Sequence, residues 1–358
     1  MENWKTVRLG DVCELIMGTS PEGNTISDNP SNGIEFHQGK TFFGKVFLNE
    51  SKIYTSAPSR FANAGNVIMS VRAPVGDSNI TQRRIAIGRG LCTFNLKDDF
   101  EKFYLFYFLN SKIEYLQSKS TGSTFKAVNK DAISDLQIPL PPLEEQKHIA
   151  AVLDKCSALI AKYKLMLEKY DTLIKSRFIE MFGNPVKNPM GWENKFGKEL
   201  FSFSSGKFLD ASKRMEKGIP VYGGNGIAWY TDIPLISFDT IIIGRVGAYC
   251  GNIKKVQEPV WVTDNAIYIK QFKEKCFNLY FLYELMSYMN FYQYADFSGQ
   301  PKITQKPLEN NKYIIPPIEK QKQFASFVQQ IDKSKFAVQK SLEKAETLYK
   351  SLMQEYFG

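Results

Sequence analysis

Cationic side chains that could contact nucleic acid occur in two separate stretches of this chain. The first stretch contains Lys40, Arg72, Arg83, Arg84, Lys119 and Lys126, and the second contains Lys207, Lys213, Arg214, Arg245 and Lys302. Arginine forks suit guanine edges, whereas lysines suit phosphate oxygens. A solvated charged surface explains any single residue at least as well, but the paired arrangement favours two DNA-binding surfaces.

Residue patterns that would support metal or nucleotide chemistry are missing from the sequence. The two histidines, His37 and His148, stand near no ligand cluster, and the five cysteines form no CxxC pair, so we expect no zinc site. No GxxxxGK[ST] loop is present to bind nucleotide phosphates. The glycines of Tyr222-Gly-Gly-Asn-Gly226 lack the GxGxxG spacing, which predicts a β-turn instead of a phosphate cradle.

Two enzyme motifs that act on DNA are also missing. Amino-methyltransferases carry a short acidic or amide residue before Pro-Pro-aromatic, but both Pro-Pro pairs here follow Leu140 or Ile315. The segment Glu145-Gln-Lys147 has the end of a restriction-nuclease spacing, without a suitable acid before it. We therefore expect no catalytic residue, metal ion or cofactor in this chain.

The composition is that of a basic globular protein. The chain has 358 residues, a net charge of +9 and a pI near 9.0, which favours polyanionic partners without requiring them. Its scattered, odd number of cysteines suggests reduced thiols. The N-terminus lacks the apolar segment of a signal peptide, and the longest apolar run, 103–109, is too short to span a bilayer. We expect a soluble cytoplasmic protein without membrane contact.

A long internal repeat organises the chain. The block 141–183 repeats as 316–358 with almost no gap, so that Pro141-Pro142 corresponds to Pro316-Pro317 and Gln146 to Gln321. A repeat of this length makes the chain a pseudo-dimer in one polypeptide. Such a molecule is suited to touching two similar places at a fixed separation.

The repeat divides the chain into four parts: 1–140, 141–183, 184–315 and 316–358. The first and third parts alternate short β-like runs with turns, and each is followed by one long helix, over 141–182 and 316–357. A fainter repeat aligns 68–80 with 241–253, which places Arg72 opposite Arg245. We expect an α/β (α+β) fold of two modules related by pseudo-two-fold symmetry and joined by two long helices, which that symmetry makes antiparallel.

The two helical segments carry heptad seams that predict a coiled coil. The seam positions include Ile149, Leu153, Ile160, Leu167 and Ile174 in the first helix, and Phe324, Val328, Val338, Leu342 and Tyr349 in the second. Arg177 and Lys335 interrupt the seams. The alternative is that each helix packs only on its own module. About 40 residues at 1.5 Å each give a rod of roughly 60 Å.

The sequence resembles the specificity subunit of type I restriction-modification systems over essentially its whole length. The most specific segments are IPLPPLEEQKHIAAVLD (138–154), its second copy IIPPIEKQKQFASFV (314–328), and FIEMFGNP (178–185) followed by NPMGW (188–192). GNVIMSVRAPVGD (65–77) and IPVYGGNGI (219–227) also match. The second copy departs from the family at Ile318-Glu-Lys-Gln321, where Leu-Glu-Glu-Gln is favoured.

The resemblance implies a division of labour within a larger complex. Each module would be a target-recognition domain that reads one half of a bipartite, asymmetric site in double-stranded DNA. The helices would set the spacer and dock two methyltransferase subunits, with a single specificity chain per complex. These partners would hold AdoMet and methylate adenine, and restriction subunits would use ATP and Mg²⁺ to translocate and cut DNA.

Three other functions are compatible with parts of the pattern. A stand-alone DNA-binding protein would form a tight complex with DNA without partners. A coiled-coil scaffold with two adaptor modules would show no salt-dependent DNA binding. An enzyme with an unrecognised site would be active as an isolated chain, and the missing motifs argue against it.

Overall fold

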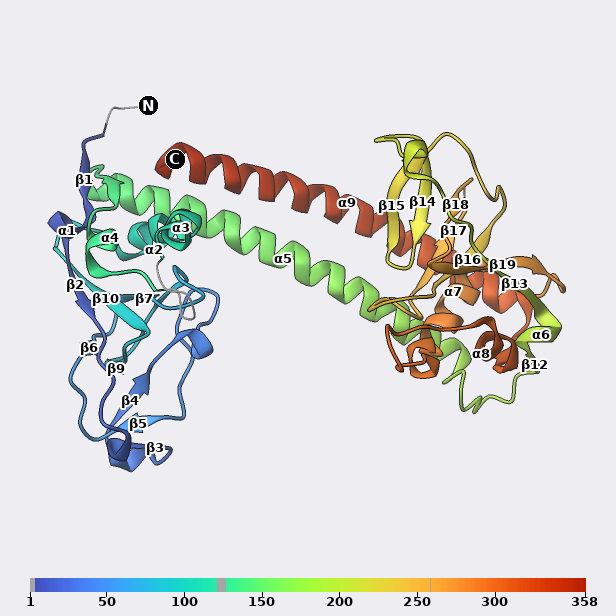
Figure 1. Ribbon diagram of the computed structural model, residues 1–358, viewed down its shortest axis with the longest axis horizontal. Helices are drawn as coiled ribbons and strands as arrows, with labels where there is room; N and C mark the ends of the chain where they lie inside the picture. Colours follow the sequence, from blue (N-terminus) through green and yellow to red (C-terminus); the bar gives the residue numbers. More distant parts are fainter. Residues whose placement is uncertain (1–3, 121–126, 258) are drawn as a thin grey trace. The chain divides into compact units, whose positions relative to one another are not determined.

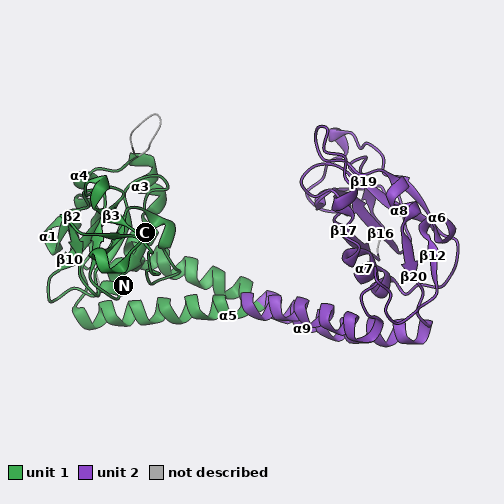
Figure 2. Cartoon of the chain, turned by 90° about the horizontal axis from the view of Figure 1, so that it is seen from below, with its two compact units in different colours: residues 1–163, 341–358 green, residues 164–340 purple. Residues whose placement is uncertain are grey.

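The computed structural model describes residues 4–120, 127–257 and 259–358. The chain divides into two compact units, one of Met1–Tyr163 with Ser341–Gly358 and the other of Lys164–Lys340. Figure 2 colours the two units. Each unit contains one module, part of helix α5 (Leu143–Phe182) and part of helix α9 (Ile318–Phe357).

The core of the first module is an antiparallel sheet in the order β2-β10-β7-β8 (Figure 1). Its strands are β2 (Cys13–Met17), β10 (Leu91–Leu96), β7 (Val67–Ser70) and β8 (Ser78–Ile80). Every residue of β7 is buried, as its continuous apolar run predicts. Helix α2 (Lys102–Ser111) supplies six consecutive buried residues, Tyr104 to Leu109, to the same module.

A second sheet of the first module has five short strands in the order β3-β5-β4-β9-β6. They are β3 (Ile26–Ser27), β5 (Tyr54–Thr55), β4 (Ile34–His37), β9 (Ile85–Ile87) and β6 (Phe61–Ala62). Leu48, Ala62, Ile85 and Ile87 belong to a small core that also contains Ile68 of β7 and Leu91 of β10. This sheet therefore packs against the main sheet, on the face opposite the large core of the module.

Short elements complete the first module. They are β1 (Thr6–Arg8) paired with β11 (Gln137–Pro139), helices α1 (Leu9–Val12), α3 (Ile113–Lys119) and α4 (Lys130–Ser134), and 3₁₀ turns η1 (Gly23–Thr25), η2 (Pro30–Asn32) and η3 (Lys40–Phe42).

The second module repeats the core of the first and differs in its second sheet. The repeated sheet has the order β13-β19-β16-β17, and the differing sheet has three strands, β15-β14-β18. The repeated strands are β13 (Phe201–Ser205), β19 (Ala266–Phe272), β16 (Thr240–Gly244) and β17 (Ile253–Val256); the others are β15 (Gly226–Thr231), β14 (Ile219–Gly223) and β18 (Trp261–Val262). The turn predicted at 222–226 is confirmed as the connection between β14 and β15.

The remaining elements of the second module follow the plan of the first. They are β12 (Asn194–Phe196) paired with β20 (Lys312–Ile314), helices α6 (Gly197–Leu200), α7 (Leu279–Tyr288) and α8 (Gln305–Asn310), and 3₁₀ turns η4 (Ala211–Lys213) and η5 (Phe291–Tyr294).

The two long helices run antiparallel, as the repeat predicts. In the first unit, Ile149 from the start of α5 shares a core with Phe357 from the end of α9. In the second unit, Phe324 from the start of α9 lies 5.7 Å from Phe182 at the end of α5, between ring centroids. The expected fold of two α/β modules and two long packed helices is therefore confirmed. Residues near the ends of both helices also pack in the cores of the modules. Each helix therefore packs both on the other helix and on the modules.

The two polar residues that interrupt the seams both find partners within the second unit. The Lys335 ammonium donates to a carboxylate oxygen of Asp171 on α5 at 2.5 Å. The Arg177 guanidinium donates to Glu180 at 2.8 Å and lies 5.9 Å from the Phe327 ring centroid on α9. The interruptions thus form cross-helix contacts and do not break either helix.

Candidate nucleic-acid interface

Arg84 is the best-placed arginine of the first module. It directly precedes β9, and its guanidinium carbon lies 4.1 Å from the ring centroid of Phe61, which begins the adjacent strand β6. The side chain is exposed, and the described residues offer it no carboxylate within ion-pair distance. Stacking on an aromatic face holds the guanidinium plane while its N–H donors stay available.

Arg83, its neighbour in sequence, is used inside the module. Its Nε and Nη2 atoms donate to Glu35 at 2.5 and 2.6 Å, and the side chain also donates to the Leu48 and Asn49 carbonyls at 3.2 and 2.9 Å. These bonds occupy the donors that DNA would need. The structure therefore gives Arg83 a structural task in place of the predicted DNA contact.

Glu35 is the centre of this internal network. Burial acts to raise its pKa, but hydrogen bonds from Arg83, from the Ser51 amide and from His37 outweigh burial and lower the pKa to about 2. Burial lowers the pKa of His37, so the ring is neutral and its Nε2–H donates to Glu35 at 2.8 Å. The tautomer is assigned from this hydrogen bond. His37 is thus part of the scaffold, without a metal-binding role.

The other cations predicted for the first module lie in separate places. Lys40 is bonded to Asp77 beside a polar hollow that also contains Asn79. Lys119 ends helix α3, with its ammonium 5.6 Å from the Tyr115 ring centroid. Lys126 lies outside the described residues. These two described lysines are exposed, as phosphate contacts require.

The predicted equivalence of Arg72 and Arg245 is wrong by one residue. Val71 accepts from the Val128 amide at 3.0 Å and donates to the Gly90 carbonyl at 2.9 Å. Arg245 makes the corresponding bonds, with the Ile303 amide and the Asn265 carbonyl, both at 2.9 Å. Arg245 therefore matches Val71 in the backbone.

This one-residue difference matters because successive side chains of an extended backbone point to opposite faces. The Arg72 side chain is exposed, whereas the half-buried Arg245 side chain donates from Nη1 to the Asp264 carbonyl at 3.1 Å. The two arginines are therefore not copies of one recognition position.

Arg214 is the best-placed arginine of the second module. It follows η4, and its guanidinium carbon lies 4.2 Å from the ring of Trp229 on β15. The backbone of Met215 pairs with Tyr230, which brings the two segments together. Trp229 buries its Nε1 atom without an acceptor in the part of the chain that the structure describes. The Trp229 ring therefore acts as an aromatic surface for Arg214 and not as a hydrogen-bond donor.

Two of the remaining cations of the second module, Lys207 and Lys213, precede Arg214 closely in sequence, whereas Lys302 lies far beyond Trp229. Lys207 and Lys213 are exposed, as is Lys302, whose backbone pairs with Asp296 and Val246. Phe208 and Ile227, which precede Arg214 and Trp229 in sequence, are exposed apolar residues, with 73% and 50% of their surface accessible. Apolar side chains of this kind can contact thymine methyl groups. These residues were not predicted from the sequence, and neither were Phe61 and Trp229.

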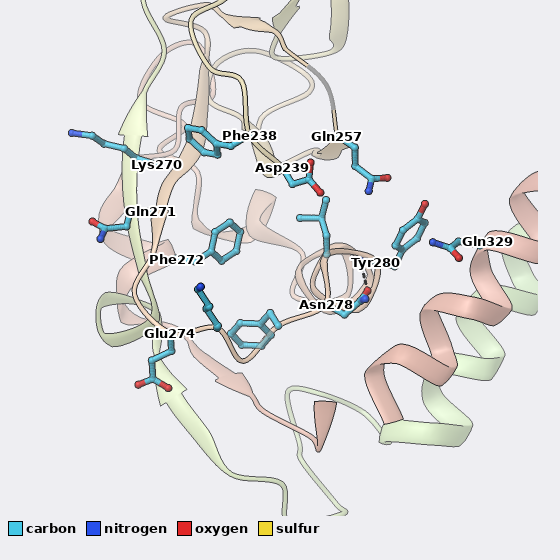
Figure 3. Close-up of a pocket in the computed structure, with 13 residues that line it drawn as sticks. Phe238, Asp239, Gln257, Lys270, Gln271, Phe272, Glu274, Asn278, Tyr280 and Gln329 are labelled. Carbon is cyan, nitrogen blue, oxygen red and sulfur yellow. Dashed lines mark hydrogen bonds between the residues drawn. The ribbon is translucent and has the colours of Figure 1, made fainter. Parts of the chain in front are cut away.

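A hollow of about 630 Å³ in the second unit does not include the stacked arginine in its lining (Figure 3). Phe238 and Phe272 line its side next to β19, and Tyr280 and Gln329 line its side next to α9. Its charged residues are of both signs, which does not fit a phosphate-binding groove. Asn278 at its base accepts from the Tyr280 amide at 2.9 Å and so caps helix α7.

Neither a metal-binding cluster nor a membrane-spanning helix occurs in residues 4–120, 127–257 and 259–358. No three His, Cys, Asp or Glu side chains among them gather in a way that could hold a metal ion. None of their helices combines the length and the apolarity of a membrane span.

The sequence pattern described as "Type I restriction modification DNA specificity domain" matches residues 1–169 and again residues 189–346. The chain belongs to this family. It is a DNA specificity subunit of a type I restriction-modification system. Specificity subunits are the non-catalytic members of such systems, so family membership confirms the expectation that this chain is not itself an enzyme.

Two relatives from Methanocaldococcus jannaschii show how far the likeness extends. A protein assigned as the MjaX specificity subunit is 40% identical over 177 residues, which cover 47% of this chain and 40% of that protein. The MjaVIII specificity subunit is 25% identical over 98% of this chain and 91% of its own length. This specificity subunit therefore spans less than half of the first relative and nearly all of the second.

A solved structure supports the same architecture. The type I restriction-modification S subunit from M. genitalium superimposes with a TM-score of 0.69 at 20% identity, covering 99% of this chain and 96% of that one. At this identity the likeness concerns the fold alone.

The predicted seam residues of this specificity subunit are mostly unavailable to partners. Ile149, Leu153, Ile174, Phe324, Val328, Val338 and Leu342 are buried within the chain, and Ile160, Leu167 and Tyr349 are half-buried. A docking surface on the helices must therefore be built mainly from other side chains. Their predicted role in setting the spacer stays a prediction.

Proposed function

We propose that each module of this specificity subunit reads one half of a bipartite, asymmetric DNA site. The observation that carries this proposal is that the specificity-domain pattern matches twice in one chain, once over each module. A chain with two readers joined by helices is suited to two half-sites at a fixed separation. Non-specific affinity would come from lysine–phosphate contacts and would fall steeply with salt.

The two half-sites differ in this proposal because the two modules differ where they carry their best-placed arginines. The main sheets share one topology, whereas the second sheets have five and three strands in different orders. Arg84 lies on the five-stranded sheet and Arg214 beside the three-stranded one. Different surfaces select different bases, so the site is asymmetric.

The long helices set the spacer and dock two methyltransferase subunits in this proposal. Each helix has 40 residues, or roughly 60 Å at 1.5 Å per residue. Because most seam positions are buried, docking would use apolar side chains on the outer face of α5. Leu165, Leu173 and Ile179 are 49%, 45% and 36% exposed.

The catalytic steps fall to the partners. The methyltransferase subunits would hold AdoMet and methylate adenine, and restriction subunits would use ATP and Mg²⁺. One specificity chain per complex, placed on the DNA by its two modules, would position both methyltransferases. A flipped adenine needs only that positioning from this chain.

Methylome mapping tests the proposal. The chain is co-expressed with its adenine methyltransferase partner in a host free of adenine methylation, and methylated adenines are mapped across the genome. A single gapped motif of two unlike half-sites with a fixed spacer is the expected result. A soluble complex that methylates no gapped motif would contradict the proposal and favour a stand-alone binder or a scaffold.

A further inference from the structure

We infer that Arg84 and Arg214 each read a guanine, one in each half-site of the DNA. The inference rests on the proposed function, because it assigns a base contact to each module. It singles out two of the many cations of the chain and predicts a G·C pair in both half-sites.

An exposed arginine stacked on an aromatic ring occurs once in each module. Three arginines in the described residues lie over aromatic rings, and one of them, Arg177, is on a long helix at 5.9 Å from its ring centroid. The other two, Arg84 over Phe61 and Arg214 over Trp229, are exposed. Their guanidinium carbons lie 4.1 and 4.2 Å from the ring centroids. No carboxylate in the described residues pairs with either guanidinium.

The other arginines of the modules lack this combination. Arg8 and Arg83 are bonded to Asp135 and Glu35. Arg245 donates to a backbone carbonyl. Arg89 lies 3.4 Å from the Ser20 hydroxyl. Arg60 and Arg72 are exposed without an aromatic platform and suit phosphate contacts, which do not require a fixed plane.

Stacking prepares an arginine for base recognition in two ways. The ring fixes the guanidinium plane, which reduces the conformational entropy lost on binding. It also covers one face with an apolar surface and leaves the N–H edge free. A planar fork of two donors matches the O6 and N7 acceptors that guanine alone presents together in the major groove.

The two stacks are not copies inherited from the internal repeat. In the second module, Arg214 follows the repeated strand β13 in the chain and precedes strand β14 of the differing sheet. In the first module, Arg84 lies after the repeated strand β8 and before β9 of the five-stranded sheet. The two arginine–aromatic stacks thus lie at different positions relative to the repeated strands. Both are in the parts where the modules differ. Selection for a base contact in each module accounts for this placement.

The test compares methylomes of arginine variants of the full chain, co-expressed with its methyltransferase partner. The variants are Arg84→Ala, Arg84→Lys, Arg214→Ala and Arg214→Lys, and the control is Arg8→Ala, which removes an exposed ion pair with Asp135. Arg84→Ala should lower the preference for guanine at one position of one half-site by about 10-fold or more. Arg214→Ala should do the same in the other half-site. The lysine variants should not restore the preference, because an ammonium lacks the planar fork.

The possible outcomes separate this inference from the proposed function. A wild-type chain with no gapped motif defeats the proposed function. A gapped motif without a G·C pair in one half-site overturns the inference alone. A uniform loss of methylation without a change of motif identifies phosphate contacts and also overturns it. Loss of complex assembly in both variants of one arginine makes that arginine structural and overturns its assignment.

Discussion

Gln146 and Gln321 make the same three hydrogen bonds in the two halves of the chain. Gln146 accepts from the Glu101 amide at 2.9 Å and donates to the Pro141 and Asp99 carbonyls at 2.9 and 3.3 Å. Gln321 accepts from the Asn278 amide at 2.9 Å and donates to the Pro316 and Cys276 carbonyls at 2.8 and 2.9 Å. Each buried amide ties the start of a long helix to the residue that caps α2 or α7.

Replacing Gln321 by alanine should destabilise the second unit. The change leaves the Asn278 amide and two carbonyls without partners, and each unsatisfied buried group costs about 1–3 kcal/mol. We expect a loss on the order of 3 kcal/mol, measured by urea unfolding, and faster amide exchange at the start of α7. Gln323→Ala, two residues away on the exposed side of the helix, is the matched control.

Gln146→Ala should have the same effect in the first unit, with faster exchange at the start of α2 and not of α7. Equal exchange at both helices in either variant would show that the two amides act globally and not as local ties.

Arg83→Ala should destabilise the first module by about 2 kcal/mol, because it leaves Glu35 without its main partner. It should leave the half-site motif unchanged. Thermal unfolding of the variant and its methylome together check this prediction. A changed motif at unchanged stability would return Arg83 to the DNA interface.

The same network predicts how the first module responds to acid. The pKa of Glu35 in the folded chain is about 2, below its unfolded value of about 4.3. Its contribution is therefore complete above about pH 4.3 and is lost as pH falls toward 2. Urea midpoints measured from pH 7 to pH 3 should fall less steeply for Arg83→Ala than for the wild type. If the midpoints of the wild type and of Arg83→Ala fell in parallel with pH, Glu35 would not be the group responsible for the acid sensitivity.

Glu284 on α7 should make the second unit less stable as pH rises from about 4.3 to 7. The side chain is 8% exposed, and burial raises its pKa to about 7, with Lys175 opposing and Asp171 adding to the rise. Because the folded pKa exceeds the unfolded value of about 4.3, stability declines between about pH 4.3 and 7 and then levels off.

Glu284→Gln should abolish this decline and stabilise the unit at pH 8 by on the order of 3 kcal/mol. Glu319→Gln changes an exposed carboxylate on α9 and serves as the control. Chemical unfolding at pH 5 and pH 8 measures both. A variant that keeps the wild-type pH dependence would assign it to another group.

Lengthening both helices by one heptad should lengthen the DNA spacer. Seven residues inserted after Tyr163 and seven after Lys340 preserve the seam register and add about 10 Å to each helix. At 3.4 Å per base pair the spacer should grow by about three base pairs. Methylome mapping should then show the original half-sites with a longer gap. An unchanged gap would mean that the helices do not set the spacer.

The long helices could be predicted closely because their signals are local and repeated. The heptad seams and the Pro-Pro pairs gave 141–182 and 316–357, and the structure has Leu143–Phe182 and Ile318–Phe357. The antiparallel pairing followed from the repeat alone. Predicting these helices required only the periodic spacing of apolar residues, and a single sequence contains that information.

The candidate interface was predicted less well because its geometry depends on contacts between distant residues. The predicted equivalence of Arg72 and Arg245 was wrong because two similar sequence segments can be aligned with a shift of one residue. The backbone hydrogen bonds of a strand allow no such shift. Arg83 looked equivalent to Arg84 until Glu35 was found 48 residues away. The Arg214–Trp229 stack depends on the pairing of Met215 with Tyr230, which has no local signal.

The sharing of each helix between units has a consequence for synthesis on the ribosome. The core of the first module contains Phe357 and packs against Tyr349 and Leu352. The core of the second module takes Phe324 and Val328 from the same helix, which are translated earlier. Chains fold from the N-terminus as they emerge. Here the module that is made first must wait longest for its last core residues, and the module that is made second can close before it.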